Sequence, residues 1–383
     1  MTIAELQSNE ELRRREFPVA REKVFLAHAG VCPLPNRVAE KIRDYAAQCT
    51  QGDQETLGPA FQMGQTRVLA ARLLNAQPEE IAFVGPTSLG LSYVAAGLPL
   101  KKRENIVVYL DDYPSNVYPW MALAERGVEV RFIRVRELGR VLPVDIERYL
   151  DEQTRLVALA SCHFLAGWRL DLAAIGALLR RRRIWFCVDG IQTVGAFPTS
   201  VEGIDFLAAD AHKWMLGPCA AGLLYVRQAL QDHLRPPIYG WNNVKCPEFI
   251  TQEAMEMRTD ARRYEAGSTN LLGLVGLHAA LELLLEVGVD NIARELWRIR
   301  SWVVPALRGK GYTVLLADAP QANAGGIISF FKPGTDMAAL HQRLLENNLA
   351  TSLRCDRAGQ RYLRISPHFY NTDAELARLL DRL

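Results

Sequence analysis

The 383-residue sequence lacks the features that mark several large classes of protein. It has no uninterrupted apolar run of the roughly 18 residues that a membrane-spanning helix needs. Its N-terminal segment is polar and charged, unlike a secretory signal. Its 45 basic and 43 acidic residues nearly cancel, so no overall charge attracts nucleic acid or an anionic membrane. We therefore expect a cytoplasmic protein with no nucleic-acid or membrane partner.

Cysteine is sparse and scattered. The seven cysteines are an odd number at wide spacing, and no two form a Cys-x-x-Cys pair. This pattern argues against a disulfide framework and against a structural zinc site, and no metal is expected. The sequence also lacks a Gly-x-Gly-x-x-Gly loop after an early strand. That absence disfavours a dinucleotide-dependent oxidoreductase, which the pattern of strands and helices would otherwise allow.

Apolar, β-rich runs alternate with helical stretches up to about residue 235. The runs are residues 80–84, 105–109, 129–133, 156–160, 184–188 and 222–226. Such alternation indicates a mostly parallel sheet covered on both faces, which binds ligands at the carboxyl ends of its strands. Two long helices are then expected over 271–287 and 289–308. The short strands and helices after them are typical of a smaller α+β domain.

Two neighbouring segments carry the chemistry. The apolar run at 184–188 ends in Asp189, and Lys213 follows shortly after in Asp-Ala-His-Lys-Trp. A pyridoxal-phosphate (PLP) enzyme needs a lysine that forms a Schiff base with the cofactor, and a carboxylate that keeps its pyridine nitrogen protonated. Alone, an Asp-Gly turn or a single lysine means little. Together, in this order, they predict a PLP site in which burial lowers the pKa of Lys213.

At these segments the sequence resembles the class V aminotransferase family, which includes cysteine desulfurases, selenocysteine lyases, kynureninases and isopenicillin N epimerase-like proteins. The resemblance rests on VDGIQTVG at 188–195 and AHKWMLGP at 211–218, and it covers most of the chain. It implies a PLP-dependent enzyme of transferase fold type I. We expect a large domain with a mostly parallel seven-stranded sheet over 15–270. A smaller α+β domain would comprise 271–383 together with 1–14.

The resemblance also implies roles for individual residues of the two segments. Asp189 would pair with the pyridine nitrogen, and Gln192 would hydrogen-bond the phenolic oxygen of the ring. Lys213 would form the Schiff base and move protons at the substrate Cα, while His212 would help to hold the phosphate. Asp210 stands where cysteine desulfurases often have serine. Because an anion beside a phosphate is unfavourable, we expect Asp210 to cap a backbone N–H or to hold His212.

Three further segments match the cofactor site of the family. The segment GPTS at 85–88 follows a strand and opens a helix, as a phosphate cradle does, and the resemblance gives that role to Thr87 and Ser88. Tyr113 occupies the place of the side chain that stacks on the cofactor ring. His163 stands where relatives have Asn near the phenolic oxygen. For His163, an ordinary loop histidine remains the alternative.

The substrate side and the dimer rest on three more residues. Arg364, in the segment RISPHFYNT, is assigned to the substrate α-carboxylate, because a planar guanidinium binds a carboxylate through two parallel hydrogen bonds. His28 lies on the N-terminal strand that borders the substrate pocket. Ser268 matches a hydroxyl residue that reaches the phosphate of a neighbouring subunit. It therefore implies a homodimer with shared active sites.

The reaction is less well defined than the cofactor, because one PLP scaffold supports several reactions. Some cysteine desulfurases carry a catalytic cysteine on a loop between two arginines. Cys355 follows Arg354, but the loop to Arg364 is short, so an incidental cysteine is favoured over a persulfide-forming one. We expect a cysteine desulfurase-like or C–S lyase reaction on a cysteine-type amino acid. The alternative is an amino-acid epimerase, like isopenicillin N epimerase, or an aminotransferase.

Overall fold

The computed structural model describes residues 1–55 and 59–383, without the side chains of 59–62. Its described residues form a central sheet in the order β2-β8-β7-β6-β5-β3-β4. The strands are β2 (Ile81–Val84), β3 (Asn105–Tyr109), β4 (Glu129–Ile133), β5 (Thr154–Ala160), β6 (Trp185–Asp189), β7 (Phe206–Ala209) and β8 (Gly222–Val226). β8 runs antiparallel to both of its neighbours, and the other pairs are parallel. The predicted seven-stranded, mostly parallel sheet is confirmed.

One strand of this sheet was not located in the sequence. The six predicted runs coincide with β2 to β6 and β8 within two residues at each end, but β7 was missed. β7 has the sequence Phe-Leu-Ala-Ala, which is short and half alanine, a residue depleted in strands. It forms a strand because it lies between β6 and β8 and is completely buried there. Tertiary position, rather than local preference, decides its structure.

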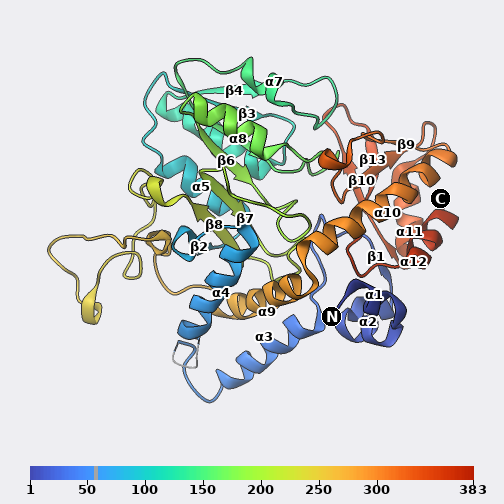
Figure 1. Ribbon diagram of the computed structural model, residues 1–383, viewed down its shortest axis with the longest axis horizontal. Coiled ribbons are helices and arrows are strands. Elements are labelled where there is room, and N and C mark those ends of the chain that lie inside the picture. Colours follow the sequence, from blue (N-terminus) through green and yellow to red (C-terminus); the bar gives the residue numbers. More distant parts are fainter. Residues whose placement is uncertain (56–58) are drawn as a thin grey trace.

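Helices cover both faces of the sheet (Figure 1). On one face, α5 (Thr87–Gly97) and α6 (Tyr118–Met121) share an apolar core with alternate residues of the strands. On the other face lie α8 (Leu172–Arg181) and α9 (Leu271–Val287), and α9 also packs against α3 and α4. The remaining helices are α1 (Ile3–Ser8), α2 (Glu10–Glu16), α3 (Asn36–Gln48), α4 (Pro59–Leu74), α7 (Pro143–Glu147), α10 (Val289–Gly309), α11 (Met337–Glu346) and α12 (Asp373–Asp381).

A second, smaller sheet follows α10. It has the order β12-β13-β10-β9 and consists of β9 (Thr313–Val314), β10 (Ile328–Phe331), β12 (Ser352–Cys355) and β13 (Arg361–Ile365). Near it, the N-terminal β1 (Val24–Phe25) pairs in parallel with β11 (Leu349–Ala350). An ion pair of 2.8 Å joins Arg13 of α2 to Glu375 of α12. The N-terminal segment therefore contacts the C-terminal part, while the domain boundaries given above stay a prediction.

The two longest helices are adjacent and sharply bent. α9 and α10 meet at an angle of 73°. Among the described residues, no single helix is long and apolar enough to cross a membrane; this bent pair meets the criterion only when both helices are counted together, by length and composition.

Candidate active site

A cavity of about 320 Å³ lies at the carboxyl ends of the parallel strands. Its lining combines eight of the predicted site residues, namely Thr87, Ser88, Tyr113, Asp189, Gln192, His212, Lys213 and Arg364. These side chains follow the ends of β2, β3, β6 and β7, and Arg364 comes from β13 of the smaller sheet. This edge of the sheet is where ligands bind in open α/β folds. The cavity is therefore the candidate active site.

Asp189 closes one side of the cavity as the last residue of β6. Its side chain is buried and accepts a hydrogen bond of 3.0 Å from the backbone N–H of Ile191. Burial, aided by the charge of Asp112, raises the pKa of Asp189 to about 7. Within the described residues Asp189 forms no ion pair. A buried carboxylate without a cationic partner fits a protonated pyridine nitrogen, which would supply one.

Lys213 lies in a tight turn that follows β7. The N–H of Leu216 bonds to the carbonyl of Lys213, and Leu216 has a positive φ of 58°. The lysine side chain is buried, and its Nζ lies 5.2 Å from the centroid of the Tyr113 ring. Burial lowers the pKa of Lys213 to about 8, although Asp189 opposes the shift. The amine is thus readily available in the neutral form that attacks a carbonyl.

The phosphate side of the cavity is organised by Asp210. Its backbone N–H donates to Thr87 Oγ1 at 2.9 Å, and its carboxylate accepts the N–H groups of Ala211, Ala220 and Ala221 at 2.8–3.0 Å. The same carboxylate lies 2.6 Å from His212 Nδ1. Both expectations for Asp210 are confirmed, since it caps backbone N–H groups and holds His212. The residues at the start of α5 and the held imidazole suit a bound phosphate.

Arg364 enters the cavity from the smaller sheet. Its side chain is 1% exposed, and Nη1 donates to the carbonyl of Phe164 at 2.6 Å. Its Nε and Nη2 are buried and have no hydrogen-bond partner in the described part of the chain. Burial, together with the charge of Arg354, lowers the pKa of Arg364 to about 9. Two unpaired N–H groups on a buried cation fit a carboxylate ligand.

Arg354 also lines the cavity, although it was not predicted as a site residue from the sequence. It lies on β12, beside β13, where Ser352 is the direct partner of Arg364. A Cβ at Gly30 would lie 3.8 Å from Nη2 of both arginines, so the absence of a side chain at Gly30 keeps the space next to them open. Arg354 and Ser352 share one face of β12, because side chains alternate along a strand. The two-residue spacing between Ser352 and Arg354 in a predicted strand is the sequence signal from which Arg354 could have been predicted to line the cavity.

Three predicted site residues lie outside the cavity lining. His163 Nε2 bonds to the carbonyl of Asp111, and its Nδ1 accepts the N–H of Ala166, both at 2.9 Å. Burial lowers the pKa of His163 to about 4, so the ring is neutral and both nitrogens are occupied. The neighbouring Phe164 lines the cavity instead. The alternative of a structural loop histidine agrees with this geometry better than a cofactor contact does.

His28 and Ser268 are likewise absent from the lining, although Ala29, the neighbour of His28 in the sequence, belongs to it. His28 Nδ1 lies 2.9 Å from the carbonyl of Ser366, and its Nε2 lies 2.8 Å from the hydroxyl of Tyr370. Burial holds the pKa of His28 well below its ordinary value, and both ring nitrogens already have partners. A substrate contact by His28 stays a prediction that this geometry does not favour. Ser268 is exposed and donates to Glu55 Oε1 at 2.8 Å. Its role toward a second subunit stays a prediction.

The cysteines also lie away from the cavity. Cys355 follows Arg354 on β12 and therefore points to the other face of that strand. Its thiol is exposed and donates to the carbonyl of Asp356 at 3.3 Å. None of the seven cysteines, all of which the structure describes, is among the residues that line the cavity.

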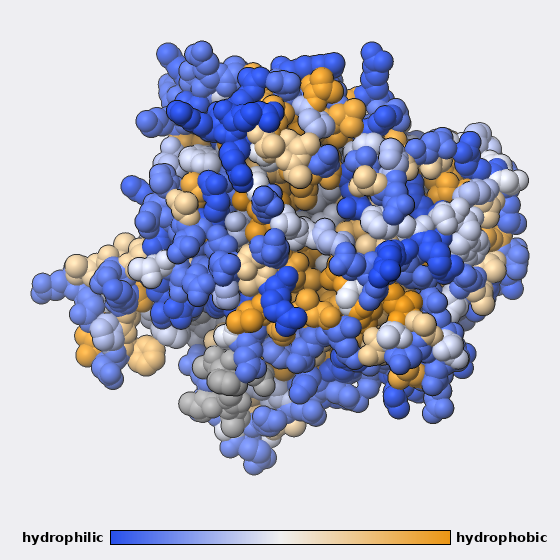
Figure 2. Space-filling view, in the orientation of Figure 1, coloured by the Kyte–Doolittle hydropathy of each residue, from blue (hydrophilic) through white to orange (hydrophobic). Residues whose placement is uncertain are grey.

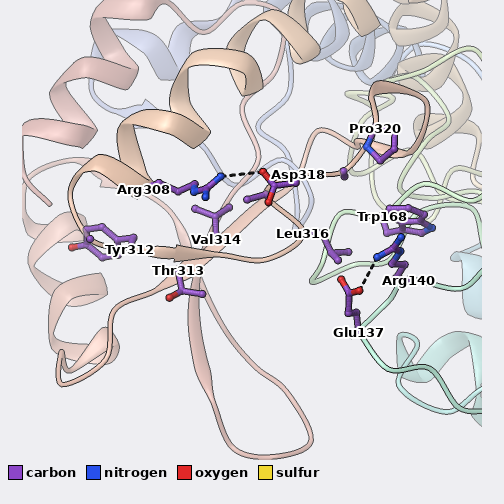
Figure 3. A pocket seen from close by; sticks show the side chains of 13 residues that line it. Glu137, Arg140, Trp168, Arg308, Tyr312, Thr313, Val314, Leu316, Asp318 and Pro320 are labelled. Atoms are coloured by element: carbon purple, nitrogen blue, oxygen red, sulfur yellow. Dashed lines mark hydrogen bonds and ion pairs between the residues drawn. The ribbon is translucent and has the colours of Figure 1, made fainter.

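A larger cavity, of about 660 Å³, lacks the groups that this chemistry needs (Figure 3). Its charged side chains pair with one another. Glu137 lies 2.7 Å from Arg140, and Arg308 lies 3.0 Å from Asp318. Arg140 also lies over the ring of Trp168, 5.4 Å from its centroid. No lysine lines this cavity, so its size does not make it the active site.

Comparison with known proteins decides the family. The family model for aminotransferase class-V matches residues 24–379. The chain belongs to this family. The expected PLP-dependent enzyme is thereby confirmed, and the cavity fits the cofactor, since it offers a buried lysine, an unpaired buried carboxylate and hydroxyl groups at a helix start.

Its relatives are mostly cysteine desulfurases. A probable cysteine desulfurase of Methanothermobacter thermautotrophicus is 28% identical, over 97% of this chain and 96% of the relative. The uncharacterised aminotransferase YcbU of Bacillus subtilis is 27% identical over 97% of both chains. A cysteine desulfurase of Escherichia coli is 29% identical over 83% and 81%.

Solved structures share the fold. The apo cysteine desulfurase of Thermococcus onnurineus NA1 has a TM-score of 0.88 and 23% identity, over 97% of this chain and 96% of that one. The cystine C–S lyase C-DES, in complex with its reaction product cysteine persulfide, also has a TM-score of 0.88 and 23% identity, over 96% and 98%. These likenesses confirm fold type I for the chain.

Proposed function

We propose that the protein is a PLP-dependent lyase that cleaves the C–S bond of a cysteine-type amino acid. One observation carries the proposal: the same cavity is lined by Lys213, by Asp189 and by Arg364 with its unpaired N–H groups, and no thiol lines it. When bound, PLP supplies an electron sink for the negative charge that develops at the substrate Cα. The names of the relatives, mostly cysteine desulfurases and a cystine C–S lyase, support a sulfur-containing substrate.

The residues around the cofactor would divide its binding between them. Asp189 holds the pyridine nitrogen in its protonated form. Thr87, Ser88 and His212 hold the phosphate, and the link from Asp210 to His212 keeps that imidazole in place. The ring of Tyr113, whose centroid lies 5.2 Å from Lys213 Nζ, would stack on the cofactor ring. All five of these cofactor-binding side chains belong to residues that line the cavity.

The cationic side chains of the cavity would bind the substrate and transfer its proton. Arg364 binds the substrate α-carboxylate through Nε and Nη2, and Arg354 adds positive charge from β12. This orientation presents the Cα–H bond to Lys213, whose Nζ removes the proton. The bond from Cβ to sulfur then breaks, and sulfur departs with its electron pair. Because Cys355 points away from the cavity, we propose that sulfur leaves with the product rather than on the protein.

Product analysis tests this proposal. With cysteine as substrate, we expect sulfide, pyruvate and ammonia in equal amounts. With cystine, the sulfur product is expected to be cysteine persulfide. The Cys355→Ser variant should keep these rates within about twofold, because the exposed thiol makes no contact with the cavity. Alanine formation that stops in Cys355→Ser would establish a desulfurase instead. A D-amino acid or transfer of the amino group to the cofactor would establish an epimerase or an aminotransferase.

We further propose a homodimer with shared active sites. Next to Ser268 in space, the segment 238–257 projects from the large sheet domain, and Figure 2 shows apolar residues on it. Its exposed apolar side chains are Ile238, Tyr239, Trp241, Phe249, Ile250 and Met255. Exposed apolar patches of this kind mark protein–protein contacts. Sedimentation analysis should give twice the chain mass, and Ser268→Ala should weaken PLP binding without dissociating the dimer.

The state of the cysteines indicates the compartment in which the protein resides. All seven are free, which suits a reducing compartment, and we propose the cytoplasm. Fractionation of cells that express the tagged chain tests this location.

A further inference from the structure

Gln192 is held between two groups that decide which way its amide faces. Its side chain is 2% exposed and lines the cavity. Its Oε1 accepts the indole N–H of Trp214 at 2.8 Å, and its Nε2 donates to the carbonyl of Ala29 at 3.2 Å. An indole N–H can only donate and a carbonyl can only accept, so the two partners fix the amide orientation. The amide nitrogen keeps a second N–H, which is free for a ligand in the cavity.

Trp214 is itself confined to one position. It is completely buried, and its carbonyl lies 3.1 Å from His368 Nε2. A Cβ at Gly326 would lie only 2.6 Å from Trp214 Cη2, and a Cβ at Gly195, where φ is 92°, would lie 2.6 Å from the Trp214 carbonyl oxygen. Two glycines thus leave room for the ring and for the backbone beside it. The indole N–H has little freedom to point anywhere but at Gln192.

We propose that Trp214 is a positioning residue, which makes Gln192 present an N–H rather than a carbonyl oxygen to the cavity. The inference rests on the proposed function and on the contact that the family resemblance implies for Gln192, a hydrogen bond to the phenolic oxygen of bound PLP. Without the indole N–H, only the longer bond of 3.2 Å to the Ala29 carbonyl still holds the amide. The amide can then swing its free N–H away from the phenolic oxygen, or turn over and place Oε1 there, where two acceptors repel; either movement removes the donor. A donor at this position stabilises the negatively charged, proton-poor state of the cofactor and so lowers the pKa at which it titrates.

The test is the pH titration of the near-visible absorption band of the holoenzyme. In Trp214→Phe, which removes the N–H but keeps an aromatic ring, we expect the midpoint to rise by about one pH unit or more, as the loss of a hydrogen bond to a charged group implies. Gln192→Leu should give a similar rise. The double variant should show no further shift, because Trp214 acts through Gln192.

A matched control separates this role from packing. Trp302 belongs to the smaller core, and its indole nitrogen has no partner among the described residues. Trp302→Phe should leave the midpoint unchanged. Folding of each variant is checked by circular dichroism and thermal unfolding. If Trp214→Phe does not fold, Gly326→Ala replaces it, since the added methyl group displaces the Trp214 ring, and the same upward shift is expected on a smaller scale.

The outcomes are distinguishable. A wild-type protein that binds no PLP and shows no band would overturn the proposed function itself. A folded, PLP-loaded Trp214→Phe or Gly326→Ala variant with an unshifted midpoint would overturn the positioning role. So would a full additional shift of Trp214→Phe in the Gln192→Leu background, because the indole would then act independently of the amide.

Discussion

Arg364→Met should make the protein more stable and much less active. Arg364 is buried as a cation with two unpaired N–H groups, and only Nη1 has a partner, the carbonyl of Phe164 at 2.6 Å. Methionine has a similar length and no charge. Replacing a poorly compensated buried ion by an apolar side chain is often neutral or stabilising. The substrate, by contrast, would lose the group that we propose binds its carboxylate.

The structure sets the size of both effects. Each unsatisfied buried donor costs about 1–3 kcal/mol, so Nε and Nη2 together cost about 2–6 kcal/mol when no substrate is bound. The substitution removes this cost, but it also leaves the Phe164 carbonyl unpaired, which destabilises the variant by about 1–3 kcal/mol. A net gain of about 1–3 kcal/mol in the free energy of unfolding is expected. Loss of two charge-assisted hydrogen bonds, at about 1.5–3 kcal/mol each, should lower kcat/KM by roughly 10²–10⁴-fold.

Urea unfolding of the holoenzyme, in a buffer free of carboxylates, measures the first effect, and initial rates measure the second. Arg300→Met is the matched control. Arg300 is also buried, at 7% exposure against 1% for Arg364, but its Nη1 and Nη2 bond to the carbonyls of Ile327 and Leu316 at 3.1 and 2.9 Å. Its loss should lower stability and leave KM unchanged. If Arg364→Met is destabilised to the same degree and keeps its KM, the assignment of Arg364 to the substrate is refuted.

Other predictions concern the cofactor side. Asp189→Asn should retain PLP but lower kcat by about 100-fold or more, because a neutral amide cannot hold the pyridine nitrogen protonated; an unchanged kcat contradicts this. Burial lowers the pKa of Lys213 to about 8, so PLP uptake by the apoenzyme should quicken about tenfold per pH unit below pH 8 and level off above it. Since Lys213 in the unfolded chain titrates near 10.5, its burial costs apoenzyme stability fully below pH 8, and the cost fades toward pH 10.5. His163→Leu should lower the thermal midpoint and leave kcat/KM nearly unchanged; a raised KM for PLP would restore its cofactor role.

The part of the site that follows strand ends was predictable from the sequence. Asp189 ends the apolar strand β6, Lys213 lies in the turn after β7, and Thr87 opens the helix after β2. In a parallel sheet the carboxyl ends of the strands meet at one edge, so residues far apart in the sequence are brought together by topology alone. The order of strands and helices was therefore enough to gather them, even though β7 itself was not recognised.

The histidines show what a local pattern cannot reveal. His163 and His28 both stand in the right segments, yet each ring is saturated by groups from elsewhere, among them the Asp111 and Ser366 carbonyls. Whether a ring nitrogen is free depends on these tertiary partners, which no spacing encodes. Arg354 was missed for the opposite reason. In the sequence, attention to a possible catalytic thiol favoured its neighbour Cys355. The alternation of side chains that turns Arg354 toward the cavity is defined only once β12 pairs with β13.

The charges of the cavity connect binding to catalysis. The cavity is lined by three cations, Lys213, Arg354 and Arg364, and by one carboxylate, Asp189. Burial is the main cause of the lowered pKa of Lys213, and the charges of the two arginines lower it further. A bound substrate carboxylate neutralises part of this positive charge, and the pKa of Lys213 must then rise. On the proposed roles, the amine of Lys213 is consequently a good nucleophile toward the cofactor in the apoenzyme. It becomes a stronger base when it is free again and the substrate carboxylate lies on Arg364. The excess of cations thus ties proton removal to the presence of the correct ligand.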